Sequence, residues 1–320
     1  MWPDADRLAE RAAARTIPGP LTQCASRPLT RRELLAGGAT LLLAPRGLPA
    51  WAEAPAPDRF FARIREIETR VDGRLGVAAL DTGAGERLGH RSGERFPMCS
   101  TFKWLLAAQV LARVDAGEES LDRVVRYGPE DVLEYAPVAR DNLARGGMTV
   151  DELCAAAVRR SDNTAANLLL AASGGPEGLT AFLRGIGDPV TRLDRIEPAM
   201  NMVGPGDERD TTTPDAMVDD LRTLLLGDAL SPASRELLAE WLVTATTGKT
   251  RLRAGLPEGW RVGDKTGTCG SGVAHDVAIA WPPGRAPILV AAYLAEADAS
   301  FEECNAALAD VGRAVAEAFA

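Results

Sequence analysis

Segments with strand character occur near both ends of the 320-residue chain, and a long stretch of helical character separates them. Apolar and β-branched residues between turn-forming residues mark these segments. The sequence predicts strands over residues 75–80, 86–90, 260–267, 273–281 and 287–295. Strand backbones must pair with one another to satisfy their polar groups. We therefore expect one sheet assembled from both ends of the chain, with a helical region inserted into it.

Two helices are expected to pack beside this sheet. The other helices are expected in the part of the chain between its first two and its last three strands. Residues 57–72 and 301–319 each repeat apolar residues at helical spacing, with charged residues between them. Residues 100–240 are mostly helical in pattern, with breaks at proline and glycine. We expect an α/β subdomain formed by residues 55–95 and 245–320, and a helical subdomain formed by residues 96–244.

The first 54 residues have the order of features that is typical of an export signal. Arg31 and Arg32 precede a short apolar run over residues 35–43, and an Ala-Glu-Ala end follows at residues 52–54. Paired arginines before such a run indicate the twin-arginine route. The alternative is a chance arginine pair before a buried helix. We expect the signal peptide, residues 1–54, to be removed and the remainder to be periplasmic or secreted, where disulfides persist.

Composition excludes several classes of function. The net charge of −9 at pH 7 disfavours a nucleic-acid partner. The two histidines, His90 and His275, lie far apart, and no spacing of Cys, His or carboxylate residues is typical of a metal site. We therefore expect no metal and no other cofactor. We also expect no membrane span in the mature protein, and a monomer, because nothing in the sequence requires an oligomer.

A hydroxyl and an amine stand three residues apart at Ser100 and Lys103, before an apolar helical run. Residues at this spacing are neighbours on one helix face, so we expect Lys103 directly above Ser100 in the first turn. The helix N-terminus offers free N–H groups and a partial positive charge. This arrangement suits a serine nucleophile whose reaction forms an oxyanion. The alternative is a Ser-Thr helix cap followed by a surface lysine.

Two further stretches carry groups that acyl transfer needs. Ser161 and Asn163 open a predicted helix, with a hydroxyl for proton transfer and an amide for a substrate carbonyl. Lys265 and Gly267 lie on a predicted strand, where the cation can fix a carboxylate and the glycine permits a close approach. The N–H of Thr268 can be a second oxyanion donor beside that of the nucleophile. Alone, the first stretch is more often a helix cap and the second more often an exposed strand end.

The segment from residue 192 to 210 has little periodicity and is expected to be a long loop. Opposite charges at Arg195 and Asp210 can pin its two ends together in an Ω-loop. Glu197 and Asn201 are then candidates to hold a water molecule. The alternative is a solvated, charged loop without a role in chemistry.

Taken in order, residues 100–103, 161–163 and 265–267 resemble the motifs of the class A serine β-lactamases and the related penicillin-binding proteins. The loop residues Glu197 and Asn201 lie between the second and third motifs, as in that family. The resemblance covers about residues 57–320. It implies an α/β (α+β) fold with an antiparallel five-stranded sheet, flanking helices and an all-helical domain. It also implies hydrolysis of the β-lactam amide bond and resistance to β-lactams.

The resemblance also implies a role for each matching residue. Ser100 would be acylated, Lys103 would keep it activated, and Ser161 would pass a proton to the lactam nitrogen. Glu197 with Asn201 would activate the water that hydrolyses the acyl-enzyme. Whether Lys103 or Glu197 is the base for acylation stays open. The other substrate-binding residues would be Asn163, Lys265, Thr266, Gly267, Thr268, Arg251 and, at the mouth of the cleft, Tyr135.

The cysteine positions resemble one branch of this family. Cys99 precedes the nucleophile and Cys269 follows the third motif, as in the carbapenem-hydrolysing class A enzymes, in which these two residues form a disulfide. Arg251 fits the same branch. The resemblance therefore implies a Cys99–Cys269 bridge and carbapenems among the substrates. Cys154 and Cys304 are expected to be free.

Two related functions share the three motifs. A D,D-peptidase would lack a dedicated carboxylate for deacylation, so Glu197 favours the β-lactamase. A non-enzymatic β-lactam sensor would be acylated and then stall, and it would be expected to keep a transmembrane anchor. The sequence therefore predicts a β-lactamase whose partners are β-lactam antibiotics, namely penicillins, cephalosporins and carbapenems.

Overall fold

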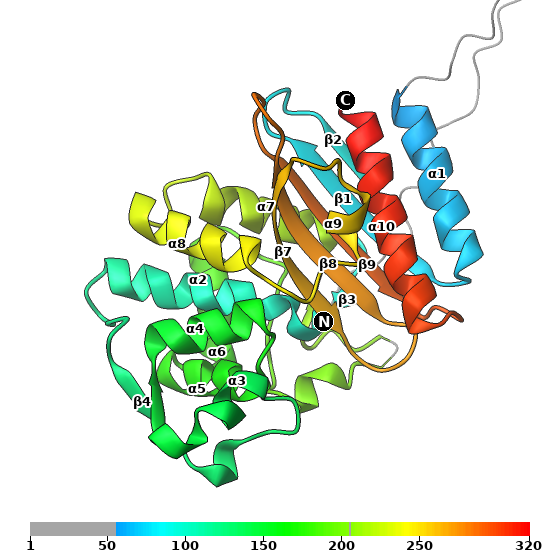
Figure 1. The fold of residues 1–320 in the computed structure, drawn as a ribbon. Helices are drawn as coiled ribbons and strands as arrows, with labels where there is room; N and C mark the ends of the chain where they lie inside the picture. Colours follow the sequence, from blue (N-terminus) through cyan, green and yellow to red (C-terminus); the bar gives the residue numbers. More distant parts are fainter. Residues whose placement is uncertain (1–55, 205) are drawn as a thin grey trace, which may run out of the picture. The chain divides into compact units, whose positions relative to one another are not determined.

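In the computed structural model, which describes residues 56–204 and 206–320, strands from both ends of the chain form one five-stranded sheet. The strand order is β2-β1-β9-β8-β7, and every neighbouring pair is antiparallel (Figure 1). Pairing of β1 with β9 joins the two ends of the chain, which confirms the predicted sheet. The strands are β1 (Arg74–Asp81), β2 (Arg87–His90), β7 (Arg261–Thr268), β8 (Ala274–Trp281) and β9 (Ile288–Ala295).

Helices cover both faces of the sheet. α1 (Ala56–Arg70) and α10 (Phe301–Ala318) lie side by side on one face (Figure 1). Phe60, Ile64 and Ile67 of α1 are buried there, and each buried side chain of this kind contributes about 1.5–3 kcal/mol. α7 (Pro214–Leu225) packs on β1 and β9, and α8 (Pro232–Val243) packs on β7.

The region between the two halves of the sheet is built around α2 (Phe102–Asp115). Its residues Phe102 to Leu111 are all buried, because other helices surround it. A helix that is apolar on every side has no solvent face to present. The helices and single turns of this region are α3 (Pro137–Asp141), α4 (Val150–Arg159), α5 (Asn163–Ala172), α6 (Gly175–Gly185), η1 (Cys99–Thr101), η2 (Pro129–Asp131), η3 (Leu143–Arg145) and η4 (Ala199–Asn201). The short helix α9 (Leu252–Gly255) packs instead on α10 and β8.

The expectation that this inserted region is all-helical is wrong in one respect. It contains two short antiparallel pairs, β4 (Val124–Arg126) with β5 (Gly147–Thr149) and β3 (Phe96–Pro97) with β6 (Thr211–Thr212). Adjacent valines favour the extended backbone of β4, and Gly146, with φ of +66°, precedes β5. The short pairs went unnoticed because two or three residues carry no readable period.

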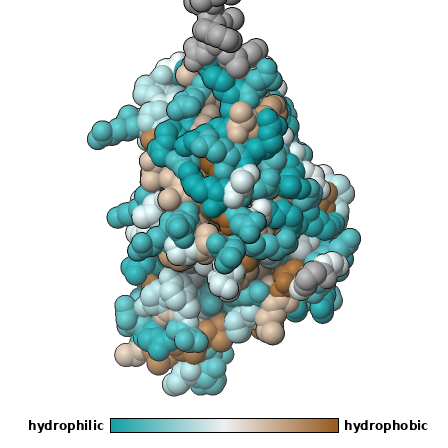
Figure 2. Space-filling model, turned by 90° about the vertical axis from the view of Figure 1, so that its right-hand side faces the viewer, coloured by the Kyte–Doolittle hydropathy of each residue, from teal (hydrophilic) through white to brown (hydrophobic). Residues whose placement is uncertain are grey.

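The face of the molecule shown in Figure 2 is mostly hydrophilic, with hydrophobic residues in small separate groups. Within the two described ranges, no helix combines the length and the apolarity needed to cross a bilayer. The predicted export signal, residues 1–54, lies outside the described residues.

Candidate active site

Ser100 lies in η1, the single 3-10 turn that leads directly into α2. The expectation that Ser100 lies in the first turn of the α-helix is therefore wrong, because Ser100 lies in the 3-10 turn that precedes this helix. Neither Ser100 nor Thr101 caps the helix with its side chain; the Thr101 hydroxyl donates instead to the carbonyl of Met98 at 2.7 Å. Cys99 adopts φ of +44°, a left-handed conformation that non-glycine residues rarely occupy. The helix-cap interpretation of this stretch is thus excluded by the geometry.

Lys103 is completely buried and its ammonium group is surrounded by oxygen atoms. Nζ donates to Ser100 Oγ at 2.9 Å, to the Ser161 carbonyl at 2.9 Å and to Asn163 Oδ1 at 2.5 Å. Its charge partner is Glu197, whose Oε1 lies 3.0 Å away. Burial lowers the pKa of Lys103 from its usual value, and the carboxylate of Glu197 opposes that shift.

Glu197 is fixed in both its side chain and its backbone. Oε2 accepts a hydrogen bond from Asn201 Nδ2 at 2.6 Å, and Oε1 lies 3.5 Å from Ser100 Oγ. Asn167 of α5 accepts from the Glu197 N–H at 3.0 Å and donates to its carbonyl at 2.9 Å. Sequence reasoning missed Asn167. Its spacing of four residues from Asn163 was the available signal, because both then project from one helix face.

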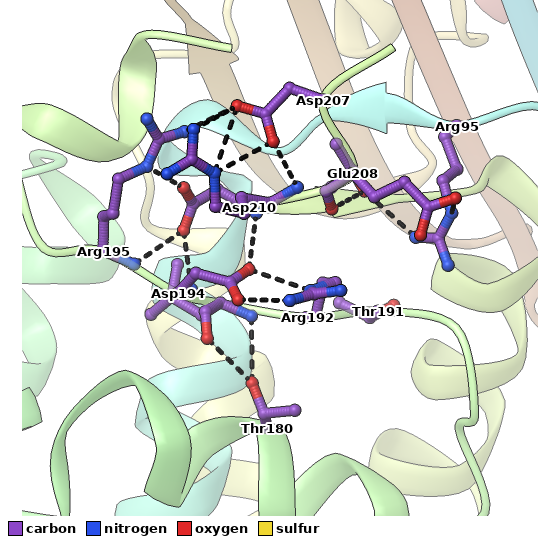
Figure 3. A network of polar contacts seen from close by, with 12 residues as sticks. Arg95, Thr180, Thr191, Arg192, Asp194, Arg195, Asp207, Glu208 and Asp210 are labelled. Atoms are coloured by element: carbon purple, nitrogen blue, oxygen red, sulfur yellow. Dashed lines mark hydrogen bonds and ion pairs between the residues drawn. The ribbon is translucent and has the colours of Figure 1, made fainter.

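The loop that carries Glu197 is held by the ion pair expected at its ends (Figure 3). Arg195 Nε lies 2.5 Å from Asp210 Oδ2, while Oδ1 of the fully buried Asp210 accepts the N–H groups of Asp194 and Arg195. In return, Asp194 Oδ2 accepts from the Asp210 N–H at 3.0 Å. Asp207 adds a second carboxylate near Arg195, at 3.9 Å. Arg195 and Asp210 are thus in direct contact, and Asp210 also bonds to the backbone at the other end of the loop.

The second motif divides into a structural residue and two residues that face Lys103. Asp162 Oδ1 accepts from the Ala165 N–H, so it caps α5, as the simpler interpretation expected. Ser161 has φ of +56° and directs its carbonyl at Lys103. Asn163 directs its side-chain oxygen at the same ammonium group.

Lys265 lies on β7 and is also fully buried, rather than at an exposed strand end. Nζ donates to Ser161 Oγ at 3.1 Å and to the Thr266 carbonyl at 2.8 Å. Burial, together with the nearby charge of Lys103, lowers the pKa of Lys265 well below its usual value. Ser161 is therefore placed between the two lysines.

A close approach between β7 and η1 requires the glycine at position 267. A Cβ atom built on Gly267 would lie 2.8 Å from the Met98 carbonyl oxygen, a separation that real side chains do not show. The strand can therefore run directly beside the turn that bears Ser100.

Arg251 is 2 % exposed and its guanidinium is almost fully hydrogen-bonded. Nη1 donates to the carbonyls of Gly267 and His275, and Nη2 donates to Thr268 Oγ1 at 2.7 Å. Nε donates to Asn305 of α10 at 2.8 Å. Because Thr268 Oγ1 accepts from Arg251, its own proton is free to point elsewhere. Asn305 was not anticipated, since it lies 54 residues from its partner.

A disulfide joins Cys99 to Cys269, with Cα atoms 5.8 Å apart, as predicted. It links the residue before Ser100 to the residue after Thr268, and so ties η1 to the end of β7. Cys154 and Cys304 are free and buried, also as predicted. Burial raises the pKa of both thiols.

Eleven residues, among them Ser100, Ser161 and Glu197, line one cleft with a volume of about 460 Å³, and the buried Lys103 and Lys265 lie behind this lining. Two of its residues were missed by sequence reasoning: Thr247, which accepts from Thr266 Oγ1 at 2.7 Å, and Phe301 at the start of α10. No group of three or more metal-binding side chains occurs in the part of the chain that the structure describes. The residues that line the cleft are Ser100, Tyr135, Ser161, Asn163, Glu197, Asn201, Thr247, Arg251, Thr266, Thr268 and Phe301.

Comparison with known proteins gives consistent results. Residues 59–319 match a family model described as the beta-lactamase enzyme family. Beta-lactamase AST-1 of Nocardia asteroides is 50% identical over 256 residues, which cover 80% of this chain and 82% of that protein. The carbapenem-hydrolyzing beta-lactamase KPC of Klebsiella oxytoca is 47% identical over 253 residues, covering 79% of this chain and 86% of that protein.

Solved structures agree with the sequence relatives. The structure of an ancestral class A beta-lactamase aligns with a TM-score of 0.80 and 62% identity, covering 81% of this chain and 100% of that one. A beta-lactamase from Xanthomonas campestris aligns with a TM-score of 0.82 and 52% identity, covering 84% of this chain and 100% of that one.

Proposed function

Because this chain belongs to the class A β-lactamase family and hydrolyses β-lactams, we propose that it acts through an acyl-enzyme on Ser100 and that its substrates include carbapenems. The observation that carries the first part is the contact of Ser100 Oγ with Lys103 at 2.9 Å, next to a carboxylate. A serine hydroxyl needs such a neighbouring base to become nucleophilic.

In the acylation step that we propose, Ser100 Oγ attacks the lactam carbonyl carbon and loses its proton to Lys103 or, through a water molecule, to Glu197. The N–H groups of Ser100 and Thr268 stabilise the oxyanion, which is worth on the order of 10²–10³ in rate for each donor. The C–N bond then breaks, and Ser161 passes a proton to the leaving nitrogen. Its position between two lysines supports this role, because proton transfer can follow the chain of contacts.

In the deacylation step that we propose, Glu197 removes a proton from a water molecule that attacks the ester carbonyl. Asn201 donates to Glu197 with its nitrogen, while its side-chain oxygen has no partner among the described residues. That oxygen can accept a hydrogen bond from the attacking water. The ester bond to Ser100 then breaks, and the free hydroxyl is restored.

Substrate recognition is assigned to the opposite end of the cleft. Lys265 supplies the positive charge for the substrate carboxylate, and the hydroxyl of Thr268 donates to it. Thr266 lines the cleft beside them, with its hydroxyl donated to Thr247. Arg251 holds Thr268 in the orientation that leaves its proton free. Asn163 presents its amide to the substrate side-chain carbonyl, and Gly267 lets β7 run close to the turn that bears Ser100.

Carbapenem turnover is supported by the Cys99–Cys269 disulfide together with the Arg251–Thr268 contact. The covalent tie fixes the two oxyanion donors relative to each other, and displacements of less than 1 Å matter for such donors. A relative that is 47% identical is named as carbapenem-hydrolyzing. Sustained hydrolysis of imipenem by residues 55–320, with a chromogenic cephalosporin as the reference substrate, tests this proposal. Sustained cephalosporin turnover without imipenem turnover would overturn it.

We further propose that the chain is exported by the twin-arginine route and cleaved after Ala54, giving a monomeric mature protein in the periplasm or medium. Within it, residues 55–95 and 245–320 form the α/β subdomain and residues 96–244 the helical one. Replacing Arg31 and Arg32 by lysine should retain the precursor in the cytoplasm. Unchanged export of that variant would point to another route.

A further inference from the structure

Few large hydrophobic side chains are exposed in residues 56–204 and 206–320, and two of those few are aromatic. Tyr135 is 53% exposed and Phe301 is 60% exposed. Both line the cleft that contains Ser100. Leaving an aromatic ring in water forgoes the free energy of its burial. The coincidence of both rings at one cleft therefore suggests that each meets the substrate.

Phe301 is held in a fixed position by the start of α10. It is the first residue of the helix, and the preceding Ser300 forms a capping box with Glu303. Asn305, one helical turn further on, accepts a hydrogen bond from Arg251 Nε at 2.8 Å. Residues four apart share a helix face, so α10 presents Phe301 and Asn305 to the same guanidinium. The Arg251 guanidinium carbon lies 5.6 Å from the centre of the Phe301 ring.

Tyr135 belongs to the other side of the cleft. Its carbonyl accepts from the Asn163 N–H at 3.0 Å, which ties it to the start of α5. The two rings therefore stand beside different substrate-binding groups: Tyr135 beside Asn163, and Phe301 beside Arg251 and Thr268.

The structure of bicyclic β-lactams indicates which part of the substrate would lie next to Phe301. In cephalosporins and carbapenems, the ring carbon next to the carboxylate-bearing carbon carries the variable second substituent. If the acyl carbon is at Ser100 and the carboxylate is at Lys265 and Thr268, as proposed above, that substituent leaves the bicycle close to the carboxylate contacts. Phe301 is the apolar group found on that side.

We propose that Phe301 is a specificity-determining residue, whose ring packs against the substituent next to the substrate carboxylate and favours flat, apolar groups there. This inference rests on the proposed binding mode of the carboxylate. Stacking of a flat group on an aromatic ring adds to ordinary burial, and the ring edge and face set a preferred geometry.

The test is a pair of cephalosporins that share one acylamino group and carry either methyl or styryl next to the carboxylate carbon. Neither group departs during hydrolysis. Phe301→Ala should lower kcat/KM for the styryl compound about five- to twenty-fold, mainly through KM, and for the methyl compound less than about two-fold. Phe301→Tyr, which keeps the ring, should restore the preference. Leu226→Ala, another exposed apolar residue, which does not line this cleft, is the matched control and should change neither substrate.

Equal losses for both compounds in Phe301→Ala would overturn the proposal and show that the ring acts through Arg251. No loss for either compound would overturn it as well. Turnover by the unsubstituted enzyme separates these results from failure of the proposed function, because an enzyme that hydrolyses neither compound contradicts the catalytic assignment itself. The melting temperature of each variant shows that the fold is intact.

Discussion

Two lysines are completely buried in this site, and they differ in their partners. Lys103 has a carboxylate partner, with Glu197 Oε1 at 3.0 Å. Lys265 makes no ion pair within the described residues, and its ammonium contacts are a hydroxyl and a carbonyl. Both contact Ser161, one through its carbonyl and the other through its hydroxyl.

This difference separates the reacting side of the cleft from its recognition side. The charge of Lys103 is balanced inside the protein, so the group can exchange a proton with Ser100 without a large change in net charge nearby. Lys265 has no carboxylate within ion-pair distance among the described residues, and the more distant Asp264 and Asp276 only partly offset the effect of burial on its pKa. A bound anion would therefore stabilise its charged form. A bound substrate carboxylate would supply the ion-pair partner that Lys265 lacks among the described residues.

The largest effect is expected from breaking the balanced pair. Lys103→Met would leave Glu197 buried without its partner, which typically costs about 3–5 kcal/mol of unfolding free energy, and would abolish turnover. Denaturant unfolding measures the stability, with the exposed Lys249→Met as the matched control. Adding Glu197→Gln to Lys103→Met should recover much of the lost stability. Full stability of the single variant would refute the pairing.

A second large effect is expected when only the base is removed. Glu197→Gln keeps the size of the side chain but cannot accept the proton of water, so deacylation should slow by about 10²–10⁴. Intact-protein mass spectrometry should then show the acyl-enzyme at steady state. Glu208→Gln, in the same loop but exposed, should show only free enzyme. Free enzyme in both variants would contradict the role of Glu197.

For Lys265 we expect a smaller loss of activity than for Lys103, and no loss of stability. Lys265→Met should lower kcat/KM for a penicillin on the order of 10², while the unfolding free energy stays the same or rises, because a buried charge without a carboxylate partner is removed. For the methyl ester of the same penicillin, which lacks the carboxylate charge, kcat/KM should differ little between Lys265→Met and the unsubstituted enzyme. A stability loss like that of Lys103→Met would show that the two lysines are equivalent.

The smallest effect at neutral pH concerns another buried basic group. Burial and the charge of Arg251 lower the pKa of His275 to about 3. Between that value and its ordinary pKa of about 6.5, the unfolded chain binds a proton that the folded chain does not, so stability falls as the pH falls. The ring of His275 packs against Tyr293, and His275→Phe keeps a ring at this place. At pH 4 the variant should be spared about 3 kcal/mol of the loss in unfolding free energy, and at pH 8 its unfolding free energy should change little. The same dependence of the unfolding free energy on pH in His275→Phe and in the unsubstituted protein would refute this account.

Ser100 and Lys103 could be paired from their spacing alone, because they are three residues apart in sequence. Glu197 lies 97 residues from Ser100, so only the resemblance of the ordered motifs to a known family pointed to its place in the site. The strands were predictable because each carries its own apolar pattern. The burial of Lys265 was not predictable, because it depends on helices that meet β7 from other parts of the chain.

Two of the missed residues, Asn167 and Asn305, have partners that come from distant elements. Asn167 holds the backbone of Glu197, and Asn305 holds Arg251, across 30 and 54 residues respectively. Neither stands in a motif. The spacing of Asn167 from Asn163 indicated the helix face that Asn167 shares, but the contact of each residue with its partner depends on how distant elements pack.

The disulfide also has a mechanical consequence. Cys99 and Cys269 are 170 residues apart, so the whole segment between them is a closed covalent ring. If the mature chain were pulled by its two ends, β1, β2, β8 and β9 could be drawn out, but the ring could not lengthen. On the order of 600 Å of contour length would stay hidden until the bond was reduced. Under tension, the oxidised enzyme would therefore behave as a much shorter chain than its sequence suggests.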